Sequence, residues 1–153
     1  MKTIGNILLT KEGKEKLEKE LADLRTKRPH ILEDLQRARA QGDLKENGAY
    51  QAARENLTNT DRRIVKLELT LRNSTVVIKQ KTDAVQIGSI IQLELNNKKI
   101  SYTIVGEAES DIKEHKISHQ SPLAQKLLGK KKGVTITLDT PNGARMYTIL
   151  SIE

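Results

Sequence analysis

Asp43 and Glu46 are the residues whose types and spacing could do chemistry in this chain of 153 residues. They lie three positions apart, so a turn or a first helical turn places both carboxylates on one side, with Cβ atoms about 5–6 Å apart. Such a pair could share one hard divalent cation such as Mg²⁺, which prefers oxygen ligands. Two oxygen donors do not complete a Mg²⁺ site, so the pair makes chemical sense if another molecule supplies the remaining ligands.

The same spacing has a purely structural interpretation. An Asp-x-x-Glu pattern at a helix start resembles a capping box, with Asp43 as N-cap and Glu46 reaching back to its backbone amide. Spacing alone favours this cap. The position of the pair favours chemistry, because the elements described next place it at a projecting tip, where a pair that only holds the fold together would be out of place.

Basic residues flank the acidic pair on both sides. In one interpretation they form a patch that holds RNA phosphates near the carboxylates. In the other they belong to a solvated helix face with ordinary ion pairs, which by itself is the commoner situation. The residues concerned are Arg37, Arg39, Lys45 and Arg54.

Two amphipathic helices, one on each side of the acidic pair, are predicted to position it. Their apolar residues recur at steps of three and four, which is the heptad pattern of a coiled-coil seam. Thr10 is the predicted N-cap of the first helix, and each seam has one polar interruption, at Arg28 and at Thr60. The first seam contains Leu17, Leu21, Leu24, Ile31, Leu35 and Ala38, and the second Tyr50, Ala53, Leu57, Ile64, Leu67 and Leu71.

The connection between the two seams is short, covering residues 41–48, so the helices should be antiparallel neighbours. Pro29 lies inside the first seam. We expect it to kink the helix rather than break it, because the seam resumes in register beyond it. Each arm of roughly 28 residues would be about 40 Å long. Residues 1–75 are therefore predicted to form an antiparallel coiled-coil finger with an acidic tip.

The second half of the chain changes to the composition of strands, with β-branched runs and turn signals. Strands are predicted at 74–78, 88–94, 99–105, 134–138 and 146–150, and a short helix after Ser121-Pro122 that stops at Gly129. The predicted fold class is thus α+β, an N-terminal antiparallel two-helix coiled-coil hairpin followed by a small, mostly antiparallel sheet domain (residues 76–153) with one short helix.

The composition excludes several classes of function. The chain contains three Tyr, no Phe, no Trp and no Cys, which argues against aromatic-lined pockets, base-stacking platforms and thiolate chemistry. The three His residues lack zinc-ligand spacing. No apolar run approaches membrane-spanning length and no signal peptide opens the chain, so we expect a cytoplasmic protein without a membrane partner. The net charge of +7 is compatible with a phosphate-bearing or acidic partner.

Several motifs in order along nearly the whole chain resemble the GreA/GreB family of bacterial transcript-cleavage factors, and in particular its GreA branch. The tip motif is carried by Gly42-Asp43-Leu44-Lys45-Glu46-Asn47, Tyr50 and Ala52-Ala53-Arg54-Glu55, and Arg28-Pro29 resembles the family's first arm. The C-terminal motifs are Tyr102 to Glu109, Lys116-Ile117-Ser118, Ser121 to Ala124, Leu127 to Lys130, Gly133 and Thr140 to Gly143.

The resemblance implies a finger that enters the secondary channel of bacterial RNA polymerase and an FKBP-like C-terminal domain that docks at the channel rim, with Ser121 and Pro122 in the docking region. Asp43 and Glu46 would help hold a second Mg²⁺ and orient a water that hydrolyses backtracked RNA. The polymerase would remain the enzyme and complete the Mg²⁺ site, so the chain would need no cofactor of its own. The basic residues, Arg39 and Arg54 above all, would face the nascent RNA 3′ end. We expect a monomer.

One departure from the family pattern bears on activity. After Asn47 the family usually reads Ala-Glu-Tyr, whereas this chain reads Gly48-Ala49-Tyr50. The tip loses negative charge, and Gly48 weakens the helix start by up to about 1 kcal/mol relative to Ala. We therefore expect weaker or more selective cleavage. Three alternatives stay open: a channel-binding regulator without cleavage activity, a prolyl isomerase, and a coiled-coil adaptor without chemistry at the tip.

Overall fold

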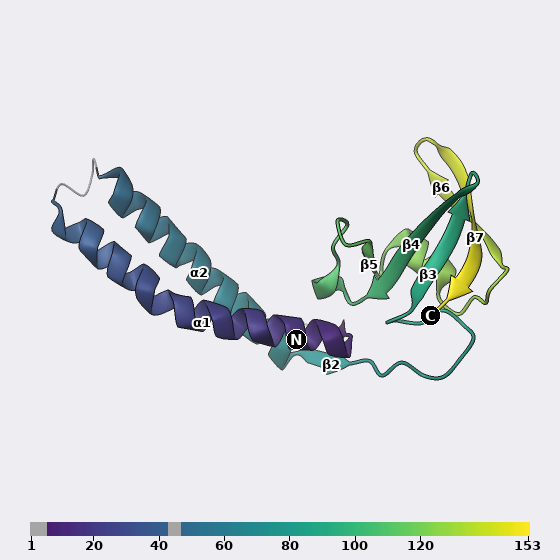
Figure 1. The fold of residues 1–153 in the computed structure, drawn as a ribbon, viewed down its shortest axis with the longest axis horizontal. Coiled ribbons are helices and arrows are strands. Elements are labelled where there is room, and N and C mark those ends of the chain that lie inside the picture. Colours follow the sequence, from purple (N-terminus) through teal and green to yellow (C-terminus); the bar gives the residue numbers. More distant parts are fainter. Residues whose placement is uncertain (1–5, 43–46) are drawn as a thin grey trace, which may run out of the picture. The chain divides into compact units, whose positions relative to one another are not determined.

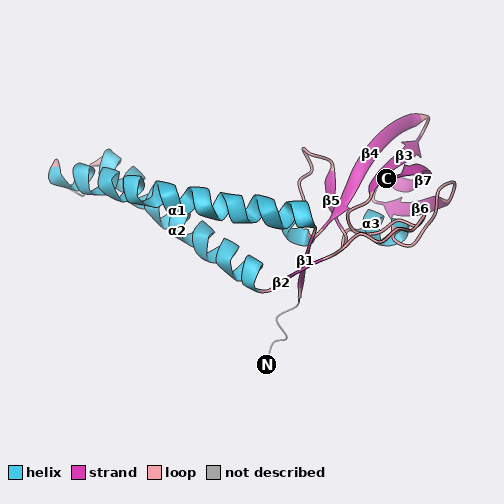
Figure 2. Cartoon of the chain, turned by 60° about the horizontal axis from the view of Figure 1, so that its bottom comes forward, coloured by secondary structure: helices cyan, strands magenta, loops and turns pink. Residues whose placement is uncertain are grey.

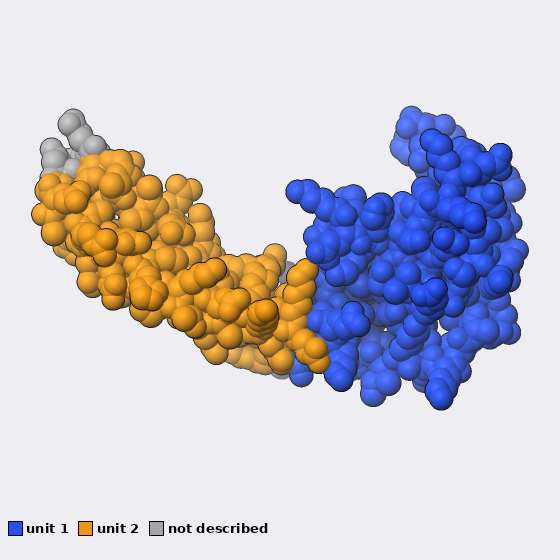
Figure 3. All heavy atoms as spheres, viewed as in Figure 1, with its two compact units in different colours: residues 1–14, 74–153 blue, residues 15–73 orange. Residues whose placement is uncertain are grey.

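The computed structural model describes residues 6–42 and 47–153. These residues form two compact units (Figure 3). One unit is residues 15–73, and the other is residues 74–153 together with the described part of residues 1–14. The boundary at residue 73 lies close to the one predicted at residue 75, whereas the N-terminal segment groups with the C-terminal half of the chain.

A helical hairpin makes up the first unit. Helix α1 spans Lys11–Ala40 and α2 spans Gly48–Arg72 (Figure 1). The α1 helix is unbroken across Pro29, as expected from the seam that continues beyond it. At its start, the backbone amide of Gly13 donates to the Thr10 hydroxyl over 3.0 Å, so Thr10 satisfies one of the free amides of the first turn, as predicted.

The facing sides of the two helices carry the predicted seam. Leu17, Leu21 and Ala38 on α1 are buried, and so is Leu67 on α2. The other seam residues are half-buried, which is typical of two helices that have no third layer to cover them. Thr60, which looked like an interruption, is also buried, with only 7% of its surface exposed, so a small polar residue still fills its place in the seam.

A five-stranded sheet dominates the second unit (Figure 2). Its strands follow the order β5-β4-β3-β7-β6, and all neighbours are antiparallel except the parallel pair β4 and β5. The strands are β3 (Ile90–Leu95), β4 (Lys98–Val105), β5 (Lys116–Ser118), β6 (Thr135–Thr140) and β7 (Gly143–Ile152). The predicted fold class, a two-helix hairpin followed by a small and mostly antiparallel sheet domain, is confirmed.

The core of this unit is aliphatic, as the composition requires. Helix α3 (Pro122–Leu127) lies next to β6 and inserts Ala124 and Leu127 into the core, both fully buried (Figure 2). A single turn of 3-10 helix, η1 (Glu107–Glu109), follows β4. The buried cluster contains Val85, Ile91, Leu93, Ile104, Ala124, Leu127, Ile136, Tyr147 and Ile149.

Two short strands that the sequence analysis did not pair explain where the N-terminal segment belongs. Strand β1 (Ile7–Leu9) runs parallel to β2 (Ser74–Val76), so the chain segments before α1 and after α2 lie side by side. The side chain of Leu9 is completely buried. Residues 6–14 therefore pack in the sheet unit, although they precede the hairpin in sequence.

Candidate functional site

Asn47 joins the ends of the two arms at the predicted tip. Its side-chain carbonyl accepts from the Tyr50 amide over 3.2 Å, which makes Asn47 the N-cap of α2. Its side-chain amide donates to the backbone carbonyl of Ala38 in the last turn of α1, over 2.9 Å. One half-buried side chain thus satisfies a free donor of α2 and a carbonyl at the end of α1.

This cap bears on the two interpretations of the acidic pair. Asp43, Lys45 and Glu46 lie outside the described residues, so the geometry of the pair stays a prediction. The structural alternative, in which Asp43 is the N-cap of the second helix, is wrong, because Asn47 occupies that position. The start of α2 is therefore satisfied without the acidic pair, and its first turn contains no acidic residue.

The three basic residues near the tip that the structure describes are all exposed. Arg37 forms an ion pair with Asp34 one helical turn away, at 3.6 Å. Arg39 and Arg54 make no ion pair with another described residue. A ligand phosphate would thus compete with an existing carboxylate partner at Arg37, and with water at Arg39 and Arg54. The latter two are the better candidates for contacts with a nucleic acid backbone.

Ion pairs between the arms form a feature that the sequence analysis missed. The guanidinium of Arg63 donates two hydrogen bonds of 2.7 Å to the Glu20 carboxylate. Arg28 makes a similar two-bond contact with Asp61, at 2.6 and 3.1 Å. The first contact lowers the pKa of Glu20, and the second lowers the pKa of Asp61, chiefly through the hydrogen bonds from the guanidinium.

The contacts between the arms account for the apparent interruption of the seam at Arg28. Arg28 does not leave a gap in the coiled coil, because it reaches across to Asp61. Arg25 and Glu68 add a third contact between the arms, at 2.7 Å. Bidentate guanidinium–carboxylate pairs restrict geometry more than single contacts do. They therefore add to the aliphatic contacts that hold the arms together along the middle of α1.

The predicted docking residues lie at the start of α3. The Ser121 hydroxyl accepts from the Ala124 amide over 3.2 Å as the helix N-cap, and Pro122 is the first helical residue. Ser121 is half-buried and Pro122 is exposed. These contacts explain why both residue types stand at this position in the fold, while a docking role for them stays a prediction.

The structure also bears on metal binding, membranes and the isomerase alternative. Within residues 6–42 and 47–153, no group of three or more Asp, Glu or His side chains could hold a metal ion. None of the helices in the described part of the chain combines the length and hydropathy needed to cross a bilayer.

The isomerase alternative would need an aromatic pocket in the sheet unit. Tyr147 is buried in the core, and Tyr102 makes an edge contact with His115 at 5.8 Å between ring centroids. The two tyrosines thus have packing roles rather than lining an aromatic pocket.

Comparisons with known proteins find the same family for the N-terminal and the C-terminal half of the chain. Residues 7–76 match the family model "Transcription elongation factor, N-terminal", and residues 79–153 match "Transcription elongation factor, GreA/GreB, C-term". The matches cover both the two-helix arm and the small sheet unit, and both place the chain among transcription elongation factors. The chain belongs to the GreA/GreB family of transcription elongation factors.

The chain is similar to several proteins named transcription elongation factor GreA. The chain is 42% identical over 152 residues to transcription elongation factor GreA of Caldanaerobacter subterraneus subsp. tengcongensis, covering 96% of this chain and 97% of the relative. It is also 42% identical to GreA of Geobacillus kaustophilus, with 95% of each chain covered. Among solved structures, GreA factor homolog 1 (Gfh1) of Thermus thermophilus matches with 28% identity and a TM-score of 0.46, covering 97% of this chain and 99% of that one. The predicted membership, including its GreA character, is confirmed.

Proposed function

We propose that the helical hairpin inserts its tip into the secondary channel of bacterial RNA polymerase and stimulates the polymerase's own Mg²⁺-dependent cleavage of backtracked RNA. In this proposal Asp43 and Glu46 supply part of a Mg²⁺ site that the polymerase completes. The chain acts as a monomer in the cytoplasm, with the polymerase and the nascent RNA 3′ end as partners. It is a factor and not an enzyme, because the catalytic centre belongs to the polymerase.

The observation that carries the proposal is the cap at Asn47. Since Asn47 satisfies the start of α2 and also contacts the end of α1, helix capping does not account for the two acidic residues of the connection. A carboxylate pair has the oxygen donors that Mg²⁺ prefers. A metal ion bound there would help activate an attacking water and stabilise the leaving oxygen when a second metal ion is present.

The hairpin suits this task because it is long and internally cross-linked. The 30 residues of α1 correspond to about 45 Å of helix. The contacts Glu20–Arg63 and Arg28–Asp61 link the two arms along the middle of α1. A catalytic pair must be placed to within about 1 Å to be effective, so the arm that carries it has to be stiff.

The basic residues and the docking residues have separate roles in the proposal. Arg39 and Arg54, with Arg37 and Lys45, attract the phosphates of the extruded RNA and hold it beside the acidic pair. Ser121 and Pro122 contact the polymerase at the channel rim and leave the chemistry to the tip.

The test is cleavage by a halted, backtracked polymerase in the presence of Mg²⁺. Asp43→Ala and Glu46→Ala should each abolish stimulated cleavage while polymerase binding persists. Asp23→Ala is the matched control, because it removes one exposed carboxylate from α1 far along the chain from the tip. Unchanged cleavage with both tip variants would refute the proposal, and it is also the result expected for a plain coiled-coil adaptor.

A second function is favoured by one observation. The first turn of α2 has no acidic residue, because Gly48 and Ala49 stand where the family usually has Ala and Glu. A tip with fewer carboxylates suits a channel-binding regulator that inhibits nucleotide addition without promoting cleavage. The two functions separate in one assay, since the regulator slows elongation and leaves backtracked RNA intact.

A further inference from the structure

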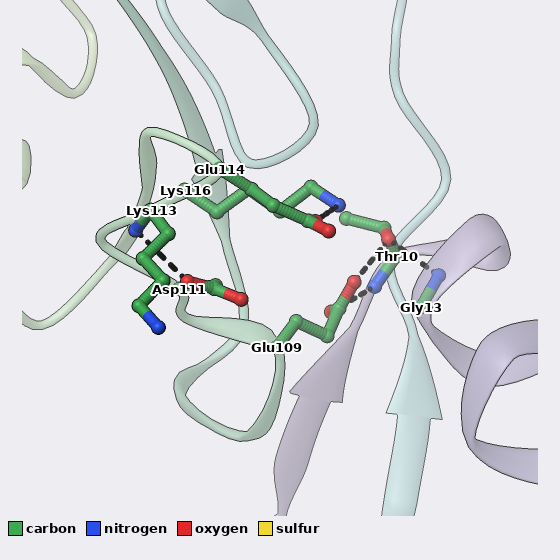
Figure 4. A network of polar contacts seen from close by, with 7 residues as sticks. All are labelled: Thr10, Gly13, Glu109, Asp111, Lys113, Glu114 and Lys116. Atoms are coloured by element: carbon green, nitrogen blue, oxygen red, sulfur yellow. Dashed lines mark hydrogen bonds and ion pairs between the residues drawn. The ribbon is translucent and has the colours of Figure 1, made fainter. Parts of the chain in front are cut away.

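The carboxylate of Glu109 accepts hydrogen bonds from a segment almost a hundred residues away. Its Oε2 atom accepts from the backbone amide of Thr10 over 2.8 Å and from that of Gly106 over 3.3 Å. Its Oε1 atom accepts from the Thr10 hydroxyl. Figure 4 shows this carboxylate directed from η1 toward Thr10, the residue just before α1. Both partner residues, Thr10 and Gly106, belong to the same compact unit as Glu109.

Thr10 passes this contact on to the helix. Its hydroxyl donates to Glu109 and accepts from the Gly13 amide in the first turn of α1. The first turn of a helix presents free N–H groups and the positive end of the helix dipole, so a carboxylate is favoured there. Glu109 forms no ion pair with a lysine or arginine among the described residues. Its charge is met by amides, by the helix end and, without an ion-pair contact, by the ammonium of Lys116, whose pKa it helps to raise.

Two glycines keep the space for this arrangement. A Cβ atom on Gly13 would lie 1.7 Å from Oε1 of Glu109, so any larger residue would push the carboxylate away. A Cβ atom on Gly106 would lie 1.8 Å from the backbone carbonyl oxygen of Leu8 in β1. Gly13 is buried and lies on the same face of α1 as the buried seam residues Leu17 and Leu21. The close approach of β1, η1 and the first turn of α1 thus depends on residues from both ends of the sequence.

The hydrogen bonds and the ion pair within the loop after η1 do not include Glu109. Lys116 pairs with Glu114 at 2.6 Å, which raises the pKa of Lys116, and the Lys113 amide donates to Asp111 over 2.9 Å (Figure 4). Loop order is therefore maintained by its own contacts. The side chain of Glu109 is left to hold the start of α1.

We propose that Glu109 is a positioning residue for the tip: its carboxylate fixes the first turn of α1 in the sheet unit. A helix of 30 residues is about 45 Å long, so a tilt of about 5° at its first turn displaces its far end by about 4 Å. A displacement of about 1 Å is already enough to impair a catalytic group severely. The inference rests on the proposed cleavage function for its activity readout.

The experiment compares four variants of the full chain: Glu109→Ala, Gly13→Ala, the double variant of both, and Glu107→Ala. The last removes an acidic residue from the same turn and serves as the matched control. Two quantities are measured for each: the rate of stimulated RNA cleavage at saturating factor, and the factor concentration that gives half of it. Amide hydrogen exchange at Thr10 and Gly13 is followed in parallel.

Glu109→Ala should lower the maximal cleavage rate about a hundredfold, with the half-saturating concentration changed by less than about twofold, because the residues proposed to dock are untouched. Gly13→Ala should do the same, although Ala is the better helix former, because its methyl group displaces the carboxylate. The double variant should be no worse than Glu109→Ala alone. Glu107→Ala should match the wild type.

Wild-type activity of Gly13→Ala would overturn the inference, and so would a Glu109→Ala effect confined to the half-saturating concentration. Should the wild-type chain itself fail to stimulate cleavage, the proposed function fails, and the exchange data decide the inference separately. Faster exchange of Thr10 and Gly13 in Glu109→Ala than in Glu107→Ala supports the positioning role. Equal exchange in the two variants overturns it.

Discussion

Replacing Asn47 should destabilise the tip end of the hairpin, because the residue makes two separate hydrogen bonds there. Loss of an N-cap costs about 1 kcal/mol, and loss of the second bond, to the carbonyl of Ala38, costs about 1 kcal/mol more because that bond is partly shielded from water. Asn47→Ala removes both and should destabilise the hairpin by about 2 kcal/mol. Asn47→Ser keeps a capping oxygen but cannot reach Ala38, so its cost should be about 1 kcal/mol.

Denaturant unfolding followed by far-ultraviolet circular dichroism measures these differences, since most of the helix lies in the two arms. Amide exchange at Tyr50, which donates to Asn47, reports the cap locally and should be faster in the Ala variant than in the Ser variant. If Asn47→Ala stays within about 0.5 kcal/mol of the wild type, as exposed substitutions usually do, the reasoning that one side chain joins the two arms is refuted.

Three further predictions concern the arms and the tip. The Glu20–Arg63 pair, whose side chains are 37% and 42% exposed, should contribute about 0.5 kcal/mol in a double-mutant cycle because solvent screens it. Since the pKa of Glu20 is lowered in the folded chain, that coupling is present above its ordinary value of 4.5 and is lost as the pH falls through the folded pKa; coupling unchanged at low pH contradicts this. Ala49→Glu should increase cleavage and stabilise the start of α2 by about 0.5 kcal/mol, and a variant that is stabilised but no more active would dissociate the two effects. Arg39→Ala and Arg54→Ala should each weaken the salt dependence of RNA binding by about one unit of slope, as measured by titration at several salt concentrations, and an unchanged slope would exclude phosphate contacts.

The hairpin could be predicted because its signals are local and repeated. Steps of three and four apolar residues continue through Pro29, and the helix does the same. The strands predicted at 88–94 and 99–105 are likewise joined by a tight turn, in which Asn96 and Asn97 have positive φ values of 50° and 60°. Gly129, predicted to stop the short helix, has a φ of 77° just after it ends.

The features that could not be predicted depend on residues far apart in the sequence. Strand β1 has only three residues and lacks the length or alternation that identifies a strand on its own. The strand predicted at 74–78 is present as β2, but its pairing with β1 across the whole hairpin could not be predicted. The contact between Thr10 and Glu109 spans 99 positions. No spacing rule reaches that far, and only the fold brings the two residues together.

In the predicted site, too, local spacing found some residues and missed those whose partners are far away in the sequence. Asp43 and Glu46 were selected by local spacing, and the same spacing suggested a cap that the structure assigns to Asn47 instead. The side chain of Asn47 was overlooked because its second bond goes to another helix. Arg28 was taken as a gap in the seam because the heptad pattern considers only apolar residues, whereas its partner Asp61 lies on the opposite arm.

The Mg²⁺ dependence of cleavage tests the central claim most directly. A halted, backtracked polymerase is titrated with Mg²⁺ in the presence of the wild-type chain, Asp43→Ala, Glu46→Ala or the Asp23→Ala control, each at saturating concentration. If the acidic pair supplies ligands to a shared ion, Asp43→Ala and Glu46→Ala should show no stimulated cleavage at the Mg²⁺ concentration that saturates the wild type, and should need about tenfold more Mg²⁺ or higher to regain any. Asp23→Ala should follow the wild-type titration. Identical Mg²⁺ titrations for all four proteins would contradict the account.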